Sequence, residues 1–319
     1  MNSTLADAVD GTAGPPAGSE TRIPSLPPGR VLLTLVRREF WEHRYLWLAP
    51  VVIAALLALS PLIGHGALQL PPFGAAESRV ALSTLVQWGL WVPLCVVMGF
   101  CLSYYLLDCL YAERKDRSIL FWKSLPVSDA LTVGSKVLVA VALVPLGVFV
   151  LALVTHLLFS TILNLRFTIG HEPLLIFNFV QWLRTEVTLF LVLLLAVLWY
   201  APWGAYLLGI SAFARRSPFL WATLPLVLAP LLERMVLGTH YLWSFINYRN
   251  YGMWAKLGIG HGNGHIFSHD HVRPFGVLLD DLDFRGAFTD LDLWLGVAVT
   301  VALVFLAIRI RARRDDTAW

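Results

Sequence analysis

The sequence predicts an all-α integral membrane protein with six transmembrane helices and an N-terminal amphipathic helix that lies in the membrane interface. Of its 319 residues, 57% are hydrophobic and only 14% are charged, whereas a soluble domain carries about a quarter charged residues. Six segments have roughly the 20 apolar residues with which a helix crosses a bilayer. The 13 tryptophans suit the aromatic belts of membrane proteins.

The chain begins with a polar tail and an amphipathic segment. Residues 1–29 are rich in Ala, Gly, Pro and Ser and lack the features of a signal peptide, so we expect a disordered cytoplasmic tail. In the segment 30–44, apolar residues recur at helical spacing and charged residues take the other faces. We expect an interfacial helix there, and the alternative is a straight cytosolic extension of the first span. Its candidate site residues are Arg37, Arg38, Glu39, Phe40 and Trp41.

Six apolar segments follow, and their flanking charges predict the orientation. The predicted spans are Leu46–Ile63, Val80–Leu107, Val137–Leu163, Val187–Phe213, Phe219–Leu237 and Leu291–Ile308. The two terminal segments and the loops on the same side of the membrane hold 16 of the 24 Lys and Arg residues. The loops on the other side hold 7. Because Lys and Arg favour the cytoplasmic side, we expect both termini in the cytoplasm. The loop 238–290 is then external, and its aromatic first half should rest on or re-enter the outer interface.

The most charged internal segment is the loop 108–136, between two long apolar helices. Such a segment should project into the cytosol, where a soluble partner can bind it. A rigid element with mixed charge and apolar anchors could carry force from that partner to the membrane helices. The alternative is a solvated loop that only sets the topology.

Several enzyme motifs are absent from the sequence. It contains no G-x-x-x-x-G-K-[ST], and the nearest fragment, residues 134–136, lacks the upstream glycine. It also contains no G-x-S-x-G and no H-E-x-x-H. We therefore expect that the chain is not itself an enzyme and binds no cofactor.

The motifs of the loop 108–136 resemble those of a known family. Glu113-Arg114 is followed by Ser118-Ile119, then by L-P-V-S at 125–128 and S-K at 135–136. Together with RREFWEHR at 37–44 and the short turn within 211–225, these motifs resemble the membrane permease of bacterial ABC-2 type ABC transporters. The resemblance covers residues 30–310, leaving 311–319 as a cytoplasmic C-terminal tail.

The resemblance implies a transport subunit of the bacterial inner membrane. It would move a substrate, in the export direction, with ATP and Mg bound by a separate cytoplasmic ABC ATPase. Two permease chains, identical or paralogous, would pair in the membrane and contact its lipids. No nucleic acid is expected as a partner. The coupling residues would be Glu113, Arg114, Asp116, Arg117, Ile119, Leu120, Phe121, Trp122 and Pro126. The alternatives are a non-transporting assembly or sensing protein with the same fold and, less favoured, an intramembrane enzyme.

The remaining candidates are histidines, cysteines and charges near the outer side. The external loop holds His261, His265, His269 and His271, side chains that suit Zn, Cu or Ni. Its many glycines favour a polar exposed loop without a metal site. His156 is either functional or bonded to a neighbouring helix, and the second is favoured. We expect the residues Arg184, Glu186, Glu233 and Arg234 to pair with one another or reach headgroups, and Cys95, Cys101 and Cys109 to be small buried hydrophobes.

Overall fold

The computed structural model describes residues 28–63, 76–119, 127–169, 172–173, 175–258 and 282–313. Within these residues the chain is helical apart from one short antiparallel hairpin. The elements in chain order are α1 (Pro28–Glu42), α2 (Tyr45–Ile63), α3 (Ala76–Asp108), α4 (Tyr111–Lys115), α6 (Asp129–Leu138), the π-helix η1 (Val139–Leu143), α7 (Val144–Arg166), β1 (Thr168–Ile169), β2 (Glu172–Pro173), α8 (Phe179–Phe213), α9 (Pro218–Leu232), the π-helix η2 (Glu233–Leu237), α10 (Tyr241–Lys256), α11 (Phe284–Thr289) and α12 (Leu291–Arg313).

Six of these helical segments are long and apolar enough to cross a membrane, which confirms the predicted multi-pass, all-α class. They are Tyr45–Ile63, Leu82–Lys115, Asp129–Arg166, Phe179–Phe213, Pro218–Val236 and Leu291–Arg313. Each includes a predicted span or nearly all of it. The helix α1 is also present, as expected from the amphipathic segment.

The third and fourth spans begin well before their predicted starts. The third begins at Asp129, because the Ser128 side chain accepts a hydrogen bond from the Leu131 amide at 3.2 Å and caps the helix. The fourth begins at Phe179, capped by Asn178. A helix of 35 residues, such as α8, is about 50 Å long and exceeds the roughly 30 Å hydrocarbon core. The bundle therefore extends beyond the membrane.

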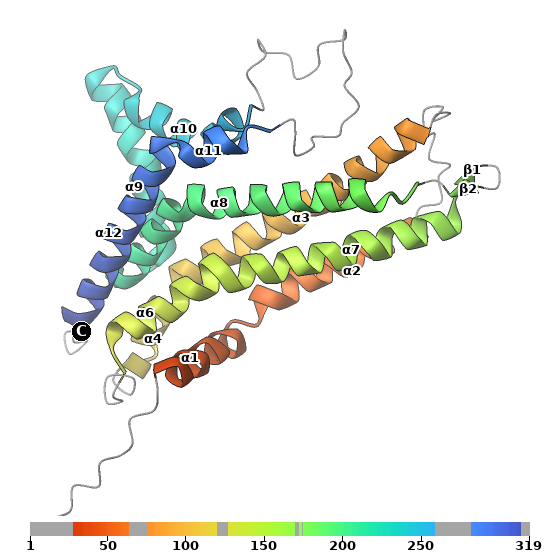
Figure 1. The fold of residues 1–319 in the computed structure, drawn as a ribbon. Coiled ribbons are helices and arrows are strands. Elements are labelled where there is room, and N and C mark those ends of the chain that lie inside the picture. The colour runs from red at the N-terminus through yellow and green to blue at the C-terminus, as the bar shows by residue number, and fades with distance from the viewer. Residues whose placement is uncertain are drawn as a thin grey trace, which may run out of the picture.

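The helix α8 lies at the centre of the bundle (Figure 1). It packs mainly against α12 and α3, while α7 packs mainly against α2. The helices α1 and α4, the start of α6 and the C-terminal end of α12 gather at one end, at the lower left of Figure 1. We call this the loop end of the bundle. The β1–β2 hairpin lies at the far tip of α7 and α8.

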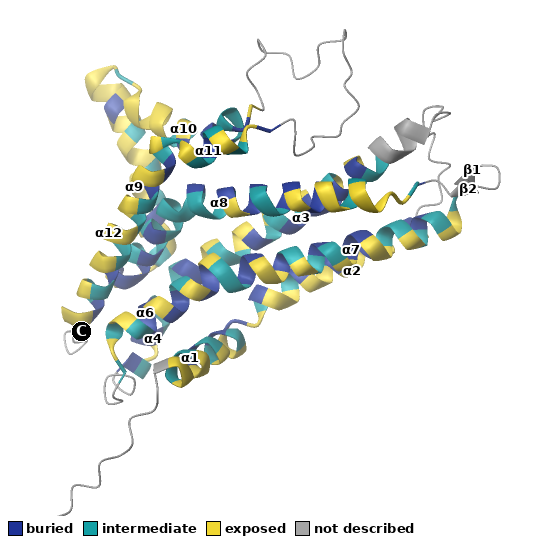
Figure 2. Ribbon diagram, viewed as in Figure 1, coloured by how far each residue is buried: buried dark blue, intermediate teal, exposed yellow. Residues whose placement is uncertain are grey.

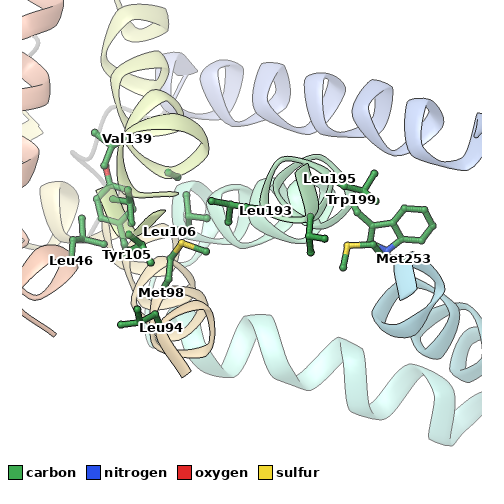
Figure 3. Close-up of a cluster of buried hydrophobic side chains, with 14 of the residues drawn as sticks. Leu46, Leu94, Met98, Tyr105, Leu106, Val139, Leu193, Leu195, Trp199 and Met253 are labelled. Atoms are coloured by element: carbon green, nitrogen blue, oxygen red, sulfur yellow. The ribbon is translucent and has the colours of Figure 1, made fainter. Parts of the chain in front are cut away.

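The core is a continuous apolar cluster that runs from the loop end toward α10 (Figure 3). Its largest buried side chain is Trp199 of α8, which packs near Met253 of α10. The Trp199 indole donates to the Arg249 carbonyl at 2.8 Å, and the Arg249 guanidinium lies 4.5 Å above the indole ring. Gly296 of α12 leaves room for this guanidinium, since a Cβ there would lie 2.1 Å from it. Three helices are thereby fixed together.

Exposed residues line the outer faces of the spanning helices (Figure 2), and many of them are large and apolar. Exposed Leu, Val, Phe and Trp side chains cover the faces of the spanning helices that point away from the core. The span that contains α9 is the least buried of the six, because only 11% of its most apolar part is buried, against 17% or more for the other five. Such a surface suits lipid, and α9 has room for a further partner.

Candidate functional site

A cluster of buried and half-buried charges lies at the loop end, at the base of the charged loop. We define the charge cluster as Arg38, Glu39, Glu113, Asp129, Lys136 and Arg311. At its centre is Lys136 of α6, which is 0% exposed. The Lys136 ammonium donates to Glu39 Oε1 of α1 at 2.7 Å and lies 3.1 Å from Glu113 Oε1 of α4. One ammonium thus joins three separate helices.

Glu113 is the acidic hub of the charge cluster. Its Oε1 also accepts from Arg38 Nη2 at 3.4 Å, and its Oε2 accepts from Arg311 Nη1 near the end of α12. The Arg311 Nε donates to Asp129 Oδ1, on the first residue of α6, at 2.9 Å. The cluster therefore balances three cations with three carboxylates. Balanced pairing matters because an unpaired buried charge would be costly.

Two further side chains extend the charge cluster around Glu39. The Tyr105 hydroxyl of α3 donates to Glu39 Oε2 at 2.9 Å. His43 Nε2 lies 3.8 Å from the same oxygen, and the His43 ring meets the Tyr105 ring edge-on with centroids 4.9 Å apart. Burial lowers the pKa of His43 below its ordinary value, and the Lys136 charge acts in the same direction, against the opposing effect of Glu39. His43 is thus favoured in its neutral form.

The next residue along the chain, Arg114, ties α4 to the end of α8. Its Nη2 donates to the carbonyls of Ser211 and Ala214, the latter at 2.9 Å. In return, the Ser211 hydroxyl accepts from the amides of Leu110 and Tyr111, each at 3.1 Å. A cation at the C-terminal end of a helix meets unpaired carbonyls and the negative end of the helix dipole. The base of the loop is therefore fixed to the central helix.

The structure places the predicted coupling residues in two different environments. Glu113 and Arg114 are buried and hydrogen-bonded, so they hold the loop in place and offer no surface to a partner. Ile119 is buried as well. Asp116 and Arg117 are exposed beside Lys115, as a partner-binding role requires. Leu120, Phe121, Trp122 and Pro126 lie outside the described residues.

The residues predicted for an interfacial helix divide between two faces of α1. Arg37 and Trp41 are exposed, and Arg38 and Phe40 are half-buried. Glu39 is buried in the charge cluster, so its place is inside the protein and not in the interface. The amphipathic pattern predicted the helix correctly. It could not predict that a charged residue would occupy the inner face, because the compensating Lys136 is far away in sequence.

A second polar group lies inside the bundle, between α3, α7 and α8. His156 Nδ1 is 2.6 Å from Glu186 Oε1, and the Gln87 amide nitrogen donates to the same oxygen at 2.8 Å. We call these three residues the buried triad. Among the described residues, His156 Nε2 and Glu186 Oε2 have no hydrogen-bond partner. The favoured prediction, that His156 bonds to a neighbouring helix, is therefore confirmed.

Two of the four predicted outer charges, Glu186 and Glu233, bind groups inside the protein. Glu186 bonds His156 and Gln87, as above. Glu233 instead accepts from the amides of Tyr241 and Leu242 at 2.7 and 2.8 Å, and from the Thr239 hydroxyl at 2.7 Å. A carboxylate at this place satisfies the free amides at the start of α10. The carboxylate of Glu233 therefore fixes the turn by which the chain leaves η2 and enters α10.

An open apolar cavity of about 820 Å³ lies between α3, α6, η1, α8, α10 and α12. Its wall includes Gly99, Val141, Val197, Trp254 and Thr300. A molecule that fits this cavity must be largely apolar, because most of the lining is hydrocarbon.

The histidines of the external loop, His261, His265, His269 and His271, lie outside the described residues. Within the described part of the chain, no group of three or more His, Cys, Asp or Glu side chains could hold a metal ion. The three cysteines are free; Cys109 is buried, and Cys95 and Cys101 are half-buried.

Sequence reasoning missed the roles of Tyr105, Lys136 and Arg311. The only local signal is that Lys136 stands at the start of a long apolar run, where an unpaired lysine would be costly. The partners of these residues could not be inferred, because Lys136 and Glu39 are 97 residues apart and Glu113 and Arg311 are 198 residues apart.

The chain matches no protein-family model, and no curated protein and no solved structure is significantly similar to it.

Proposed function

We propose that this chain is the membrane-spanning permease subunit of an ABC transporter and exports a substrate with energy from ATP hydrolysis on a separate subunit. The loop motifs from Glu113 to Lys136 resemble the ABC-2 permease class. The observation that carries the proposal is the charge cluster at the base of that loop. A loop that is rigidly joined to several membrane helices is what a force-transmitting element requires.

The cluster offers a direct mechanical path from the loop into the membrane. A push on Lys115, the exposed residue of α4, reaches Glu113 in the same helix. From there, Lys136 leads into α6, η1 and α7, and Arg311 leads into α12. Arg114 carries the same displacement to α8. Removing one partner of a buried ion pair costs roughly 3–5 kcal/mol, so these elements should move together.

The proposal includes a membrane sidedness and a set of partners. The loop end faces the cytoplasm of a bacterial cell, where the ATPase subunit binds ATP and Mg and contacts the exposed part of the loop. A second permease chain, identical or paralogous, completes the assembly. The ratio of 16 to 7 in Lys and Arg supports this orientation.

The test is purification of the tagged full-length chain from its own host in mild detergent. We expect Mg-dependent, vanadate-sensitive ATP hydrolysis in the purified complex. Native mass spectrometry should show two permease chains and two ATPase chains. Charge reversal at an exposed loop residue, Lys115→Glu, should weaken ATPase retention roughly fivefold, the equivalent of about 1 kcal/mol.

The matched control is Arg285→Glu, which reverses an exposed charge on α11, away from the loop end. It should leave ATPase retention unchanged. If the chain purifies in a stable form without ATP hydrolysis, the transporter proposal fails and a non-transporting assembly or sensing protein takes its place. Equal effects of the two variants would remove the loop from the docking surface.

A further inference from the structure

The outer face of α1 carries a stripe of alternating arginine and apolar side chains. We define the arginine stripe as Arg30, Leu33, Arg37, Trp41 and Arg44. The successive spacings of three and four residues place the first four on one helical face. All five side chains are exposed; Leu33 is 69% exposed and Trp41 is 61% exposed. Arg44 continues the stripe, since its guanidinium lies 5.8 Å from the Trp41 ring.

The opposite face of α1 fixes the direction in which the stripe points. Leu35, Glu39 and His43 are spaced four residues apart and are all buried. Glu39 is held by Lys136 and Tyr105 within the charge cluster. The helix therefore cannot rotate without breaking buried ion pairs, and the arginine stripe stays on the outside.

The chemistry of the stripe selects an anionic lipid surface. A guanidinium matches the oxygens of a phosphate, and Leu and Trp side chains can enter the acyl region beside it. The stripe contains no acidic residue, and Glu42, the exposed carboxylate of α1, is bonded to Arg38 at 2.6 Å. Just beyond Arg44, the exposed side chains of Trp47, Leu48, Val51 and Val52 belong to the first span. The stripe is thus continuous with a lipid-facing surface, which favours a membrane over a soluble protein partner.

We propose that the arginine stripe is a binding site for anionic phospholipid headgroups and sets the depth and orientation of α1 in the bilayer. The apolar side chains enter the acyl boundary, and the three guanidinium groups bind lipid phosphates. Because α1 shares the charge cluster with the loop, lipid bound at the stripe holds one end of that cluster in place. The inference needs only a membrane-embedded chain and does not rest on the proposed transport function.

The test measures binding of fluorescent phosphatidylglycerol to the full-length chain in neutral detergent, with phosphatidylcholine of the same acyl chains for comparison. The wild type should prefer phosphatidylglycerol, and added salt should reduce the preference. The double variant R37Q/R44Q should weaken phosphatidylglycerol binding by at least about tenfold, since each arginine near an anionic surface contributes about 1 kcal/mol. Binding of phosphatidylcholine should not change.

The matched control is R215Q/R216Q, which removes two exposed arginines from the turn between α8 and α9. If both double variants weaken binding equally, or the wild type does not discriminate between the lipids, the proposal is overturned. Competition by inorganic phosphate at equal ionic strength would point to a free-anion site instead. Rapid labelling of Leu33→Cys by a water-soluble reagent, in a cysteine-free chain in phosphatidylglycerol nanodiscs, would show that this position lies in water and not in the acyl boundary, and it would overturn the proposal.

Discussion

At the scale of single residues, Lys136 gives the loop end its geometry. It is a point charge with three donors, and two carboxylates from distant parts of the chain lie within 3.1 Å of it. In sequence, Gly134-Ser135-Lys136 resembles the end of a phosphate-binding motif. In the fold, the ammonium faces carboxylates and is closed to solvent. The residues 134–136 therefore have a structural role and do not form a nucleotide-binding site.

His43 predicts a pH dependence of stability. Burial lowers its pKa below the ordinary value of 6.5, so the unfolded chain takes up a proton at a higher pH than the folded chain does. The stabilisation from a neutral His43 is therefore present above about pH 6.5 and is lost as the pH falls below that value. Thermal unfolding in detergent should show an apparent Tm that decreases between pH 7 and pH 5.5.

The variant His43→Gln isolates this contribution, because glutamine does not titrate in this range. Its apparent Tm should be less sensitive to pH between 7 and 5.5 than that of the wild type. An equal decrease in both proteins would assign the pH effect to other groups and refute this role of His43.

At the scale of elements, one long helix connects the two polar clusters. The segments α6, η1 and α7 form a continuous helix, in which Lys136 and His156 are 20 residues, or about 30 Å, apart. The π-helix η1 follows directly after α6 and begins three residues after Lys136. Wide turns of this kind often occur at functional places in helices. Motion of Lys136 along the helix axis would therefore be passed toward the buried triad.

The buried triad predicts a strong coupling between α7 and α8. Glu186→Ala removes the acceptor of two buried donors, and each donor left without a partner costs roughly 1–3 kcal/mol. We expect a decrease in apparent Tm for Glu186→Ala and for His156→Ala. The double variant should be less destabilised than the sum of the two, with a coupling free energy of about 0.5–3 kcal/mol.

The control for this cycle is Thr161→Ala, an exposed position of α7 whose hydroxyl bonds only to its own helix in the described contacts. It should change the apparent Tm little. Additive effects of the two triad variants would mean that the hydrogen bond between His156 and Glu186 contributes no coupling.

At the scale of the whole molecule, the six candidate spans of the described residues predict that the two termini lie on the same side of the membrane. The charge asymmetry predicts that this side is the cytoplasm. Single cysteines at Ser3 and Asn263, in a chain without its native cysteines, should react with an impermeant reagent from opposite sides of the membrane. Reaction of Ser3→Cys from outside intact cells would invert the topology and, with it, the proposed loop function.

The exposed helix α9 is the place where a second permease chain is expected. Among the spans it is the least buried, and its large apolar side chains include Phe219, Leu220 and Trp221. The resemblance to ABC-2 permeases assigns part of the subunit interface to the first, second and fifth spans, of which α9 forms the fifth. An interface of large apolar side chains would fit this surface.

The sequence by itself determined the membrane class, the six spans and the amphipathic α1. These properties depend on local composition and periodicity. A bilayer selects for both directly, because unpaired polar backbone groups and charged side chains are unstable in its hydrocarbon core. The same local patterns placed the loop 108–136 between two spans. They did not place the starts of the third and fourth spans correctly, since the caps Ser128 and Asn178 lie outside the apolar runs.

The tertiary structure alone decided which charges are buried and what each one binds. Glu39, Glu113, Lys136 and Arg311 come from four helices, and only packing brings them within bonding distance. The same holds for His156 and Glu186, whose partners could not be read from spacing. A charge can enter a low-dielectric interior only beside an opposite charge or a hydrogen-bonding partner. The identity of that partner is therefore a property of the fold and not of any local sequence pattern.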